Sequence, residues 1–379
     1  MTIGTEHEYS INDNRFNALP ISDQIIKTIC GRFASEILFG DTKLSKELQK
    51  TVIEIIPRTP SDNLVSLEGH LFNGVRKFYH IFRDKYRLLG LGMHPTLTLD
   101  QTAVWDHDEK EFYEEYDRIF NIHQHGWLNI QALQINLSYS KDKELLTHYN
   151  RIRSLLPFLI AVTASSPMVE GDLTGIADNR LAFYRENQKE IPLICNRIIP
   201  EKIRTIEEYR AIQDNVFSEL RLRGAAILCE EWVNSSGLII RFSRNCLEIK
   251  ALDEQECIHS DMAVCAVVRS LLRCPTLPVP QDQQSLLEVT DRAMHGGTAE
   301  VKPELVDLFN LAWKHANAEE RLYLPVIANR IERGSLAELI RDRYERDGDI
   351  IPILHDMAMC LQRNTSYGNG AKKNLTLIR

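Results

Sequence analysis

The sequence predicts an α+β fold, in which an antiparallel sheet is flanked by helices and followed by a helical C-terminal region. Three observations lead to this prediction. Short segments of alternating apolar and polar residues recur before residue 275, as expected of half-buried strands. Two of them, 237–243 and 246–251, follow each other closely like hairpin partners, which favours antiparallel pairing. After the Pro-rich segment 275–280, only helical patterns remain.

The individual elements follow from periodicity. Strands are predicted at 2–11, 51–56, 90–94, 132–140, 226–231, 237–243 and 246–251, and helices at 22–39, 62–89, 143–165, 206–223 and 259–273. Beyond the Pro-rich segment, helices are predicted at 284–295, 303–316, 319–333, 335–347 and 350–362. We therefore expect a catalytic domain at 1–280, a helical region at 281–363 and a flexible tail at 364–379.

Composition narrows the class of protein. The chain has 379 residues and a net charge of -8, so it has no basic field to hold nucleic acid or anionic lipid. No apolar run is long enough for a membrane helix, and the N-terminus lacks the features of a signal peptide. The eight cysteines are scattered, which is typical of reduced thiols. We expect a soluble cytoplasmic protein, and the sequence leaves open whether it is a homo-oligomer.

The predicted strands carry polar residues suited to metal-bound polyphosphate. In 132–140, Gln134 and Asn136 lie on the face opposite the apolar residues, and in 246–251 the same holds for Glu248 and Lys250. A solvated sheet face explains any one such strand. Together, however, they offer oxygen ligands for magnesium and cations for phosphate. The polar or charged residues on these strands are Glu6, Glu8, Glu54, Gln134, Asn136, Arg241, Glu248 and Lys250.

Glu6 and Glu8 are two residues apart on the first strand. This spacing places both carboxylates on one face, roughly 6.6 Å apart, so they can serve one metal or two adjacent metals. Such pairs are also common on exposed strands. Glu54 is less ambiguous, because a carboxylate within an apolar run is partly buried and needs a cation or hydrogen-bond donors.

Several polar residues have both a structural and a functional interpretation. Arg241 is preferred to Arg244 for the site, because residues three apart on a strand point in opposite directions. His94 precedes a proline at a strand end and suits a site role or a structural hydrogen bond equally well. Asn234 belongs first to a turn, from which it can also reach a central site.

Six short motifs, in order along the chain, resemble those of the glutamate–cysteine ligase / carboxylate–amine ligase family. They are GTEHE at 4–8, IEI at 53–55, GMHP at 92–95, LQINL at 133–137, SSP at 165–167 followed by Gly171, Gly175 and Arg180, and LEIKALD at 247–253. The resemblance implies a glutamine-synthetase-like fold with a curved antiparallel sheet. It also implies an ATP- and Mg²⁺-dependent ligase, with Mn²⁺ as a substitute.

In that family, ATP phosphorylates a small carboxylate, usually that of glutamate, and an amine then attacks the acyl phosphate. By motif position, Glu6, Glu8, Glu54 and Glu248 would be metal ligands. Gln134 and Asn136 would face the metals or phosphates, Lys250 would hold the ATP phosphates, and Arg180 the substrate carboxylate or the transferred phosphoryl group. Such chemistry needs positioning and charge neutralisation more than a nucleophile. The absence of a glycine-rich phosphate loop is consistent with it.

Two departures from the family pattern leave the reaction open. Lys250 stands where arginine is usual, and Gln134 and Asn136 replace the two histidines of one subgroup. The amine acceptor is therefore not defined: cysteine, which would make the protein a glutamate–cysteine ligase, is only the commonest acceptor of the family. One alternative is a zinc amidohydrolase with His94, His123 and His125 as ligands. The sequence around His123 and His125, however, is more typical of a surface loop than of a zinc site. Another is a family member that binds its ligand without turnover.

Overall fold

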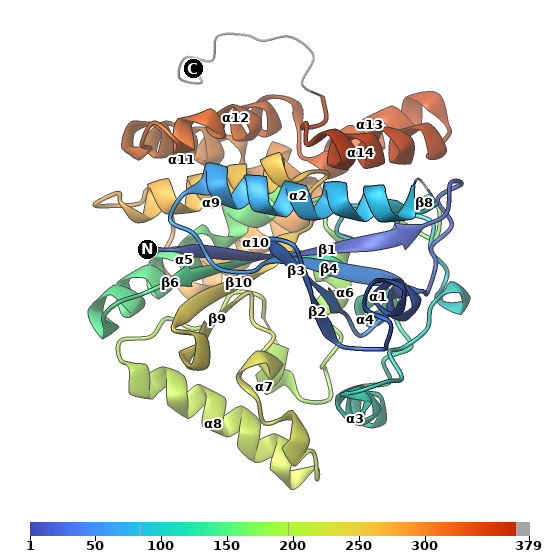
Figure 1. The fold of residues 1–379 in the computed structure, drawn as a ribbon. Helices are drawn as coiled ribbons and strands as arrows, with labels where there is room; N and C mark the ends of the chain where they lie inside the picture. Colours follow the sequence, from blue (N-terminus) through green and yellow to red (C-terminus); the bar gives the residue numbers. More distant parts are fainter. Residues whose placement is uncertain (84, 196, 369–379) are drawn as a thin grey trace.

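The computed structural model describes residues 1–83, 85–195 and 197–368 (Figure 1). Its centre is an antiparallel sheet of eight strands in the order β2-β3-β4-β1-β6-β10-β9, with β5 also paired to β1. This arrangement confirms the α+β class. The strands are β1 (Ile3–Asn12), β2 (Glu36–Phe39), β3 (Thr42–Lys46), β4 (Val52–Pro57), β5 (Arg87–Leu89), β6 (Ala132–Ser138), β9 (Leu238–Arg241) and β10 (Cys246–Asp253). A separate hairpin joins β7 (Met168–Val169) and β8 (Asp172–Leu173).

Helices cover one face of the sheet in two layers. The inner layer holds α2 (Leu64–Phe82), α5 (Asp142–Thr163) and α9 (Ile258–Leu272), with α10 (Gln283–Gly296) packed on α5. Figure 1 shows the outer layer above them, formed by α11 (Lys302–His315), α12 (Leu324–Arg333), α13 (Leu336–Asp347) and α14 (Ile351–Arg363). No helix in the described part of the chain is long and apolar enough to cross a membrane.

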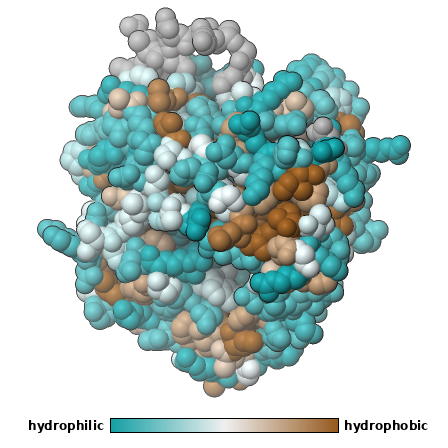
Figure 2. Space-filling view, in the orientation of Figure 1, coloured by the Kyte–Doolittle hydropathy of each residue, from teal (hydrophilic) through white to brown (hydrophobic). Residues whose placement is uncertain are grey.

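The opposite side of the sheet is only partly covered. Figure 1 shows α3 (Lys110–Phe120), α7 (Pro192–Cys195) and α8 (Ile206–Leu222) below the sheet. The remaining short helices are α1 (Ser22–Cys30), α4 (His125–Leu128) and α6 (Asn179–Tyr184). In the same orientation, Figure 2 shows a mostly hydrophilic surface with apolar residues gathered near its centre. The possible homo-oligomer stays a prediction.

One hydrophobic core joins the sheet to the C-terminal helices. It runs from Ile135 of β6 through Leu156 of α5 and Val264 of α9 to Leu308 of α11. The region 281–363 therefore packs on the helical side of the sheet, and its separation from 1–280 as a domain stays a prediction. Of the expected tail, residues 369–379 lie outside the described residues.

Two expected helices end early in the structure, and the last residues of each form a strand instead. The helix at 22–39 ends at Cys30, where Gly31 adopts φ 81°, and residues 36–39 instead form β2, which pairs with β3. The helix at 62–89 ends at Phe82, and residues 87–89 form β5 beside β1. In both cases the apolar residues fit a helical stripe, but pairing with a neighbouring strand determines the conformation.

Two expected strands are absent. Residues 90–94 form a loop that passes close to β10, since a Cβ on Gly92 would lie 2.1 Å from Cγ of Asp253. Residues 226–231 instead run through two 3-10 turns, η2 (Ala226–Leu228) and η3 (Glu231–Val233), and they pair with no strand in the described part of the chain. A short apolar run does not by itself distinguish a strand from a packed loop.

Candidate active site

A cleft of about 490 Å³ opens on the sheet face that the helical layers leave free. Strand β1 shows how the two faces differ. His7 points toward the helices, where its Nδ1 lies 3.2 Å from Oδ2 of Asp261 on α9. Its neighbours Glu6 and Glu8 point the other way and line the cleft. The alternation of side chains along one strand therefore separates the core from the site.

The strand register brings the four expected carboxylates onto one face. Glu8 lies directly opposite Glu54 on β4, while Glu6 lies opposite Gln134 on β6. Asn136 lies opposite Glu248 on β10. Since β4, β1, β6 and β10 are consecutive in the sheet, the cleft has a continuous polar floor, which is made of Glu54, Glu8, Glu6, Gln134 and Glu248. Asn136 lies on the same face but does not line the cleft.

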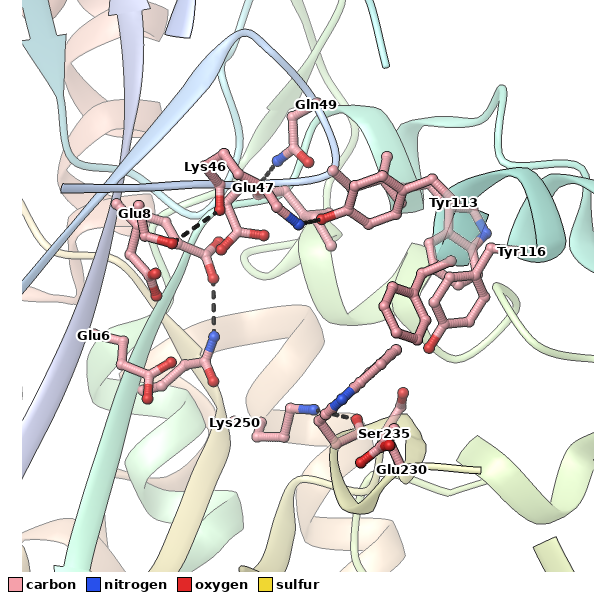
Figure 3. Close-up of a pocket in the computed structure, with 18 of the residues that line it drawn as sticks. Glu6, Glu8, Lys46, Glu47, Gln49, Tyr113, Tyr116, Glu230, Ser235 and Lys250 are labelled. Atoms are coloured by element: carbon pink, nitrogen blue, oxygen red, sulfur yellow. Dashed lines mark hydrogen bonds between the residues drawn. The ribbon is translucent and has the colours of Figure 1, made fainter. Parts of the chain in front are cut away.

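A fifth carboxylate, Glu47, joins this surface from the turn between β3 and β4. Carboxylate oxygens of Glu8, Glu47 and Glu54 lie within 4.8 Å of one another. Figure 3 shows Glu8 and Glu47 side by side in the cavity. Sequence analysis missed Glu47 because it is not on a strand. Its place beside the cluster follows only from the register of β3 and β4, in which Ser45 lies opposite Glu54.

The electrostatics of this cluster suit a divalent cation. Burial, together with the neighbouring carboxylates, raises the pKa of Glu8 to about 7 and that of Glu47 to about 8. The same two causes hold the pKa of Glu54 well above its usual range. Carboxylates resist ionisation where no cation balances them, and oxygen atoms are the ligands that Mg²⁺ prefers. The donor set at Glu8, Glu47 and Glu54 therefore fits magnesium.

The amides on β6 hold the carboxylates in place. Gln134 Nε2 donates to Glu8 Oε1 at 2.9 Å, and Asn136 Nδ2 donates to Glu6 Oε1 at 3.0 Å. The backbone N–H of Ala132 donates to the other oxygen of Glu8 at 2.8 Å. In this structure, Gln134 and Asn136 thus orient the acidic residues rather than presenting free groups to a ligand.

Cations lie beside the carboxylates. Arg241 Nη1 is 2.6 Å from Glu248 Oε2, and Arg244 Nη1 is 2.9 Å from Glu6 Oε1. Arg241, the arginine preferred from the sequence, lines the cleft, and so does Arg244, although residues three apart on a strand would point in opposite directions. The reason is local: the chain leaves β9 in a 3-10 turn, Phe242–Arg244, followed by Asn245 at φ 52°. The alternation of a strand no longer holds there.

Lys250 extends from β10 into the same cleft. Its Nζ donates to the backbone carbonyls of Trp232 at 3.2 Å and Asn234 at 3.5 Å. It has no carboxylate partner within the described residues. A partly buried ammonium group without a counter-ion is well suited to receive a phosphate oxygen.

Arg180 is not among the residues that line the cleft. Its guanidinium is buried, with Nε 2.7 Å from Oδ1 of the buried Asp253. Both of its Nη atoms lie 3.4 Å from the carbonyl oxygen of Lys250. Arg180 therefore supports β10 at the position of Lys250, and in this geometry it does not reach a ligand in the cleft.

His94 and Asn234 also lie outside the cleft. Nδ1 of the buried His94 accepts a hydrogen bond from the backbone of Thr96 at 3.3 Å, and burial lowers the pKa of His94 to about 4. Asn234 Oδ1 accepts from the backbone N–H of Ser236 at 3.0 Å, which closes a turn. Their structural interpretations therefore fit better than direct site roles.

The three histidines of the zinc alternative do not converge. None of the metal-competent groups found in the described ranges contains His94, His123 or His125. Instead, His125 Nε2 lies 3.0 Å from Oε1 of Glu170 on the surface. The geometry thus gives no support to a histidine-ligated zinc site.

An aromatic wall faces the carboxylates across the cleft. We use this name for Phe112, Tyr113, Tyr116, Trp127, Tyr184 and Trp232. Figure 3 shows Tyr113 and Tyr116 on the far side of the cavity from Glu6 and Glu8. Sequence analysis missed the wall because it rests on α3, α4, α6 and η3, none of which was predicted.

The fold and the site define a protein with an acidic cleft on the free face of an open antiparallel sheet. The sequence model described as glutamate-cysteine ligase family 2 matches residues 2–356, and the chain belongs to this family. The resemblance inferred from the motifs is confirmed.

Individual relatives agree with this assignment. A protein of Archaeoglobus fulgidus is 48% identical over 368 residues, which cover 96% of this chain and 100% of the relative. A glutamate–cysteine ligase of Halobacterium salinarum is 29% identical over 196 residues, 48% of each chain. Among solved structures, the fold is similar to that of glutamate–cysteine ligase from Francisella tularensis in complex with AMP, with a TM-score of 0.66, 12% identity, and coverage of 97% of this chain and 89% of the other. A bifunctional glutathione synthetase from Pasteurella multocida gives a TM-score of 0.63 at 13% identity, covering 96% of this chain and 52% of the other.

Proposed function

We propose that the protein is an ATP- and Mg²⁺-dependent carboxylate–amine ligase that forms an amide of the γ-glutamyl type through an acyl phosphate. The observation that carries the proposal is the cluster of Glu8, Glu47 and Glu54 within 4.8 Å, on a floor shared with Glu6 and Glu248. Mn²⁺ can take the place of Mg²⁺ at such oxygen ligands. The AMP bound to the Francisella tularensis ligase supports a nucleotide substrate.

The chain's own residues supply positioning and charge. Glu8, Glu47 and Glu54, with Glu6 and Glu248 beside them, would hold the metal, which neutralises polyphosphate charge when bound. Lys250 would contact a phosphate oxygen, since its Nζ has only carbonyl partners. Gln134 and Asn136 keep the carboxylates Glu8 and Glu6 oriented through their amide groups.

Two displacements complete the reaction. First, a carboxylate oxygen of the substrate attacks the γ-phosphorus of ATP, a new O–P bond forms, the bridging O–P bond breaks and ADP leaves. Second, the nitrogen of a neutral amine attacks the acyl carbon, a C–N bond forms and the C–O bond to phosphate breaks. The proton that the amine loses ends on the departing phosphate, which leaves as inorganic phosphate. Both steps need in-line positioning and charge stabilisation rather than a protein nucleophile.

The proposal also covers the substrates and the cellular compartment of the enzyme. The substrate carboxylate is glutamate and the acceptor is a small amine. All eight cysteines are free, which supports a reducing compartment such as the cytoplasm. A binding protein without turnover is the weaker alternative. Binding alone would not require that the cleft keep all of its floor carboxylates, which are Glu6, Glu8, Glu47, Glu54 and Glu248.

Hydroxylamine trapping tests the proposal without knowledge of the acceptor. We expect purified protein with ATP, Mg²⁺, glutamate and hydroxylamine to form the hydroxamate and release ADP in equal amounts. Glu248→Gln should reduce the rate by at least about 100-fold, because a neutral amide is a poorer metal ligand. Glu36→Gln is the matched control, since Glu36 lies on β2 in an exposed pair with Lys43. ATP-independent amide cleavage, or wild-type activity in Glu248→Gln, would contradict the proposal.

A further inference from the structure

A buried carboxylate outside the cleft is bonded to the strand that carries the metal site. Glu254 directly follows β10, is fully buried and does not line the cleft. Its Oε2 accepts a hydrogen bond from the backbone N–H of Glu8 at 3.3 Å. This N–H and the cleft carboxylate belong to the same residue, so a bond that fixes the backbone also limits where the carboxylate points. The proposed reaction assigns no role to Glu254.

The bond from Glu8 to Glu254 forms where the ladder between β1 and β6 ends. The register of these two strands runs only as far as His7, so Glu8 is one residue beyond it. The backbone N–H of Glu254 donates to the carbonyl of Gln131 at 3.3 Å. The next residue, Ala132, donates its N–H to the carboxylate of Glu8. Both the backbone and the carboxylate of Glu8 are therefore tied to the same place, where the chain enters β6.

Two further buried residues hold the side chain of Glu254 in place. His7 Nδ1 lies 3.4 Å from Glu254 Oε1 and 3.2 Å from Asp261 Oδ2 on α9. The other ring nitrogen of His7, Nε2, lies 2.8 Å from Thr5 Oγ1. Buried charges are tolerated when they are paired, and here one imidazolium faces two carboxylates. A substitution that removes the charge of either carboxylate therefore leaves a balanced pair, so such variants are expected to fold.

We propose that Glu254 is a positioning residue of the metal site, which fixes Glu8 through its backbone and touches neither the metal nor a substrate. This inference rests on the proposed function, because it takes Glu8 as a ligand of the divalent cation. Hydrogen bonds to a metal ligand orient it before the ion arrives, and their loss typically weakens metal binding by about 10–100-fold. Gln134 and Ala132 orient the carboxylate of Glu8 directly, and Glu254 does so from the backbone side.

Three substitutions of Glu254 separate this role from the pairing with His7. Glu254→Met removes the acceptor, Glu254→Asp keeps the charge but is one methylene shorter, and Glu254→Gln removes the charge but keeps an oxygen for the Glu8 N–H. Isothermal titration with Mn²⁺ alone measures the Kd for the ion. We expect Glu254→Met and Glu254→Asp to raise this Kd by at least about tenfold, and Glu254→Gln to stay within about threefold of the wild type. Asp261→Asn is the matched control and should leave the Kd unchanged, because Asp261 contacts the same His7 ring, whereas the Glu8 N–H is bonded to Glu254.

The hydroxamate assay gives a second measurement. In Glu254→Asp we expect the KM for Mg²⁺ to rise by at least about tenfold, while kcat at saturating Mg²⁺ stays within about threefold, because the metal ligands themselves are intact. If Glu254→Met shows no cooperative unfolding in urea, Glu254→Asp decides the comparison. A wild-type Kd in Glu254→Asp, or an equal rise in Asp261→Asn, would overturn this inference alone. A wild-type protein that binds no Mn²⁺ and forms no hydroxamate would overturn the proposed function and this inference with it.

Discussion

Glu8 on β1 lies directly opposite Glu54 on β4, and the two residues are only 6% and 4% exposed. Like charges placed opposite each other on neighbouring strands destabilise a sheet. The pair is therefore a feature that a bound cation would stabilise.

The Glu8–Glu54 pair predicts opposite effects of one substitution with and without metal. In metal-free buffer we expect Glu54→Gln to be at least as stable as the wild type, because it removes one of the crowded buried carboxylates. Adding Mg²⁺ should raise the Tm of the wild type but not that of the variant, since ligands stabilise the state they bind. Thermal unfolding at several Mg²⁺ concentrations measures both effects. An equal Mg²⁺-induced shift in the two proteins would contradict the metal assignment.

Lys250 is expected to act through its charge. Lys250→Met should lower kcat/KM for ATP in the hydroxamate assay by at least about 100-fold, because a desolvated cation next to phosphate is lost. Lys250→Arg should retain activity within about tenfold, since the charge remains and a fork of donors suits phosphate. Lys43→Met, which removes a half-buried lysine of β3 that is paired with Glu36, is the control. Full activity in Lys250→Met would exclude the phosphate role.

We expect Arg180 to contribute to the stability of the fold rather than directly to the reaction. Arg180→Met leaves Asp253 buried without its partner at 2.7 Å, which should cost about 3–5 kcal/mol in the free energy of unfolding. Arg185→Met breaks an exposed pair with Asp291 and should cost less than about 1 kcal/mol. Urea denaturation measures both. A stable Arg180→Met that has lost activity would instead support direct substrate contact by Arg180.

His94 predicts a specific pH dependence of stability. Burial lowers its folded-state pKa to about 4, below the value of 6.5 for an unperturbed histidine. The unfolded chain therefore binds a proton first, so this stability is complete above pH 6.5 and is lost as the pH falls to about 4, by at most about 3 kcal/mol. We expect the difference in unfolding free energy between wild type and His94→Gln to shrink across this interval. His355→Gln, which alters an exposed histidine, should show no such trend.

Local alternation was enough to predict much of the site. Gln134 faces the cleft, Asn136 lies on the same face and bonds to Glu6, and Leu133 and Ile135 face the core, as the period of two along a strand requires. The placement of Glu6, Glu8 and Glu248 on the same face follows from the same rule. That rule does not specify which strands are neighbours, so the Glu8–Glu54 pairing became visible only in the sheet.

Residues off the strands could not be placed in this way. Glu47 lies in a turn, Arg244 in a 3-10 turn and Phe112 on a helix that was not predicted. For Arg180, a family motif predicts a ligand contact, whereas the fold pairs its guanidinium with Asp253. Each depends on contacts between segments that lie far apart in the sequence.

The sequence by itself determined the α+β class, the family, the paired carboxylates on β1 and the faces of the strands, because these features depend on local periodicity and short motifs. The tertiary structure alone decided that Glu47 completes a cluster with Glu8 and Glu54, that Arg241 and Arg244 both reach the cleft, and that an aromatic wall faces the floor. The reason is physical. Strand register and helix packing, rather than local propensity, set which side chains meet across a cavity.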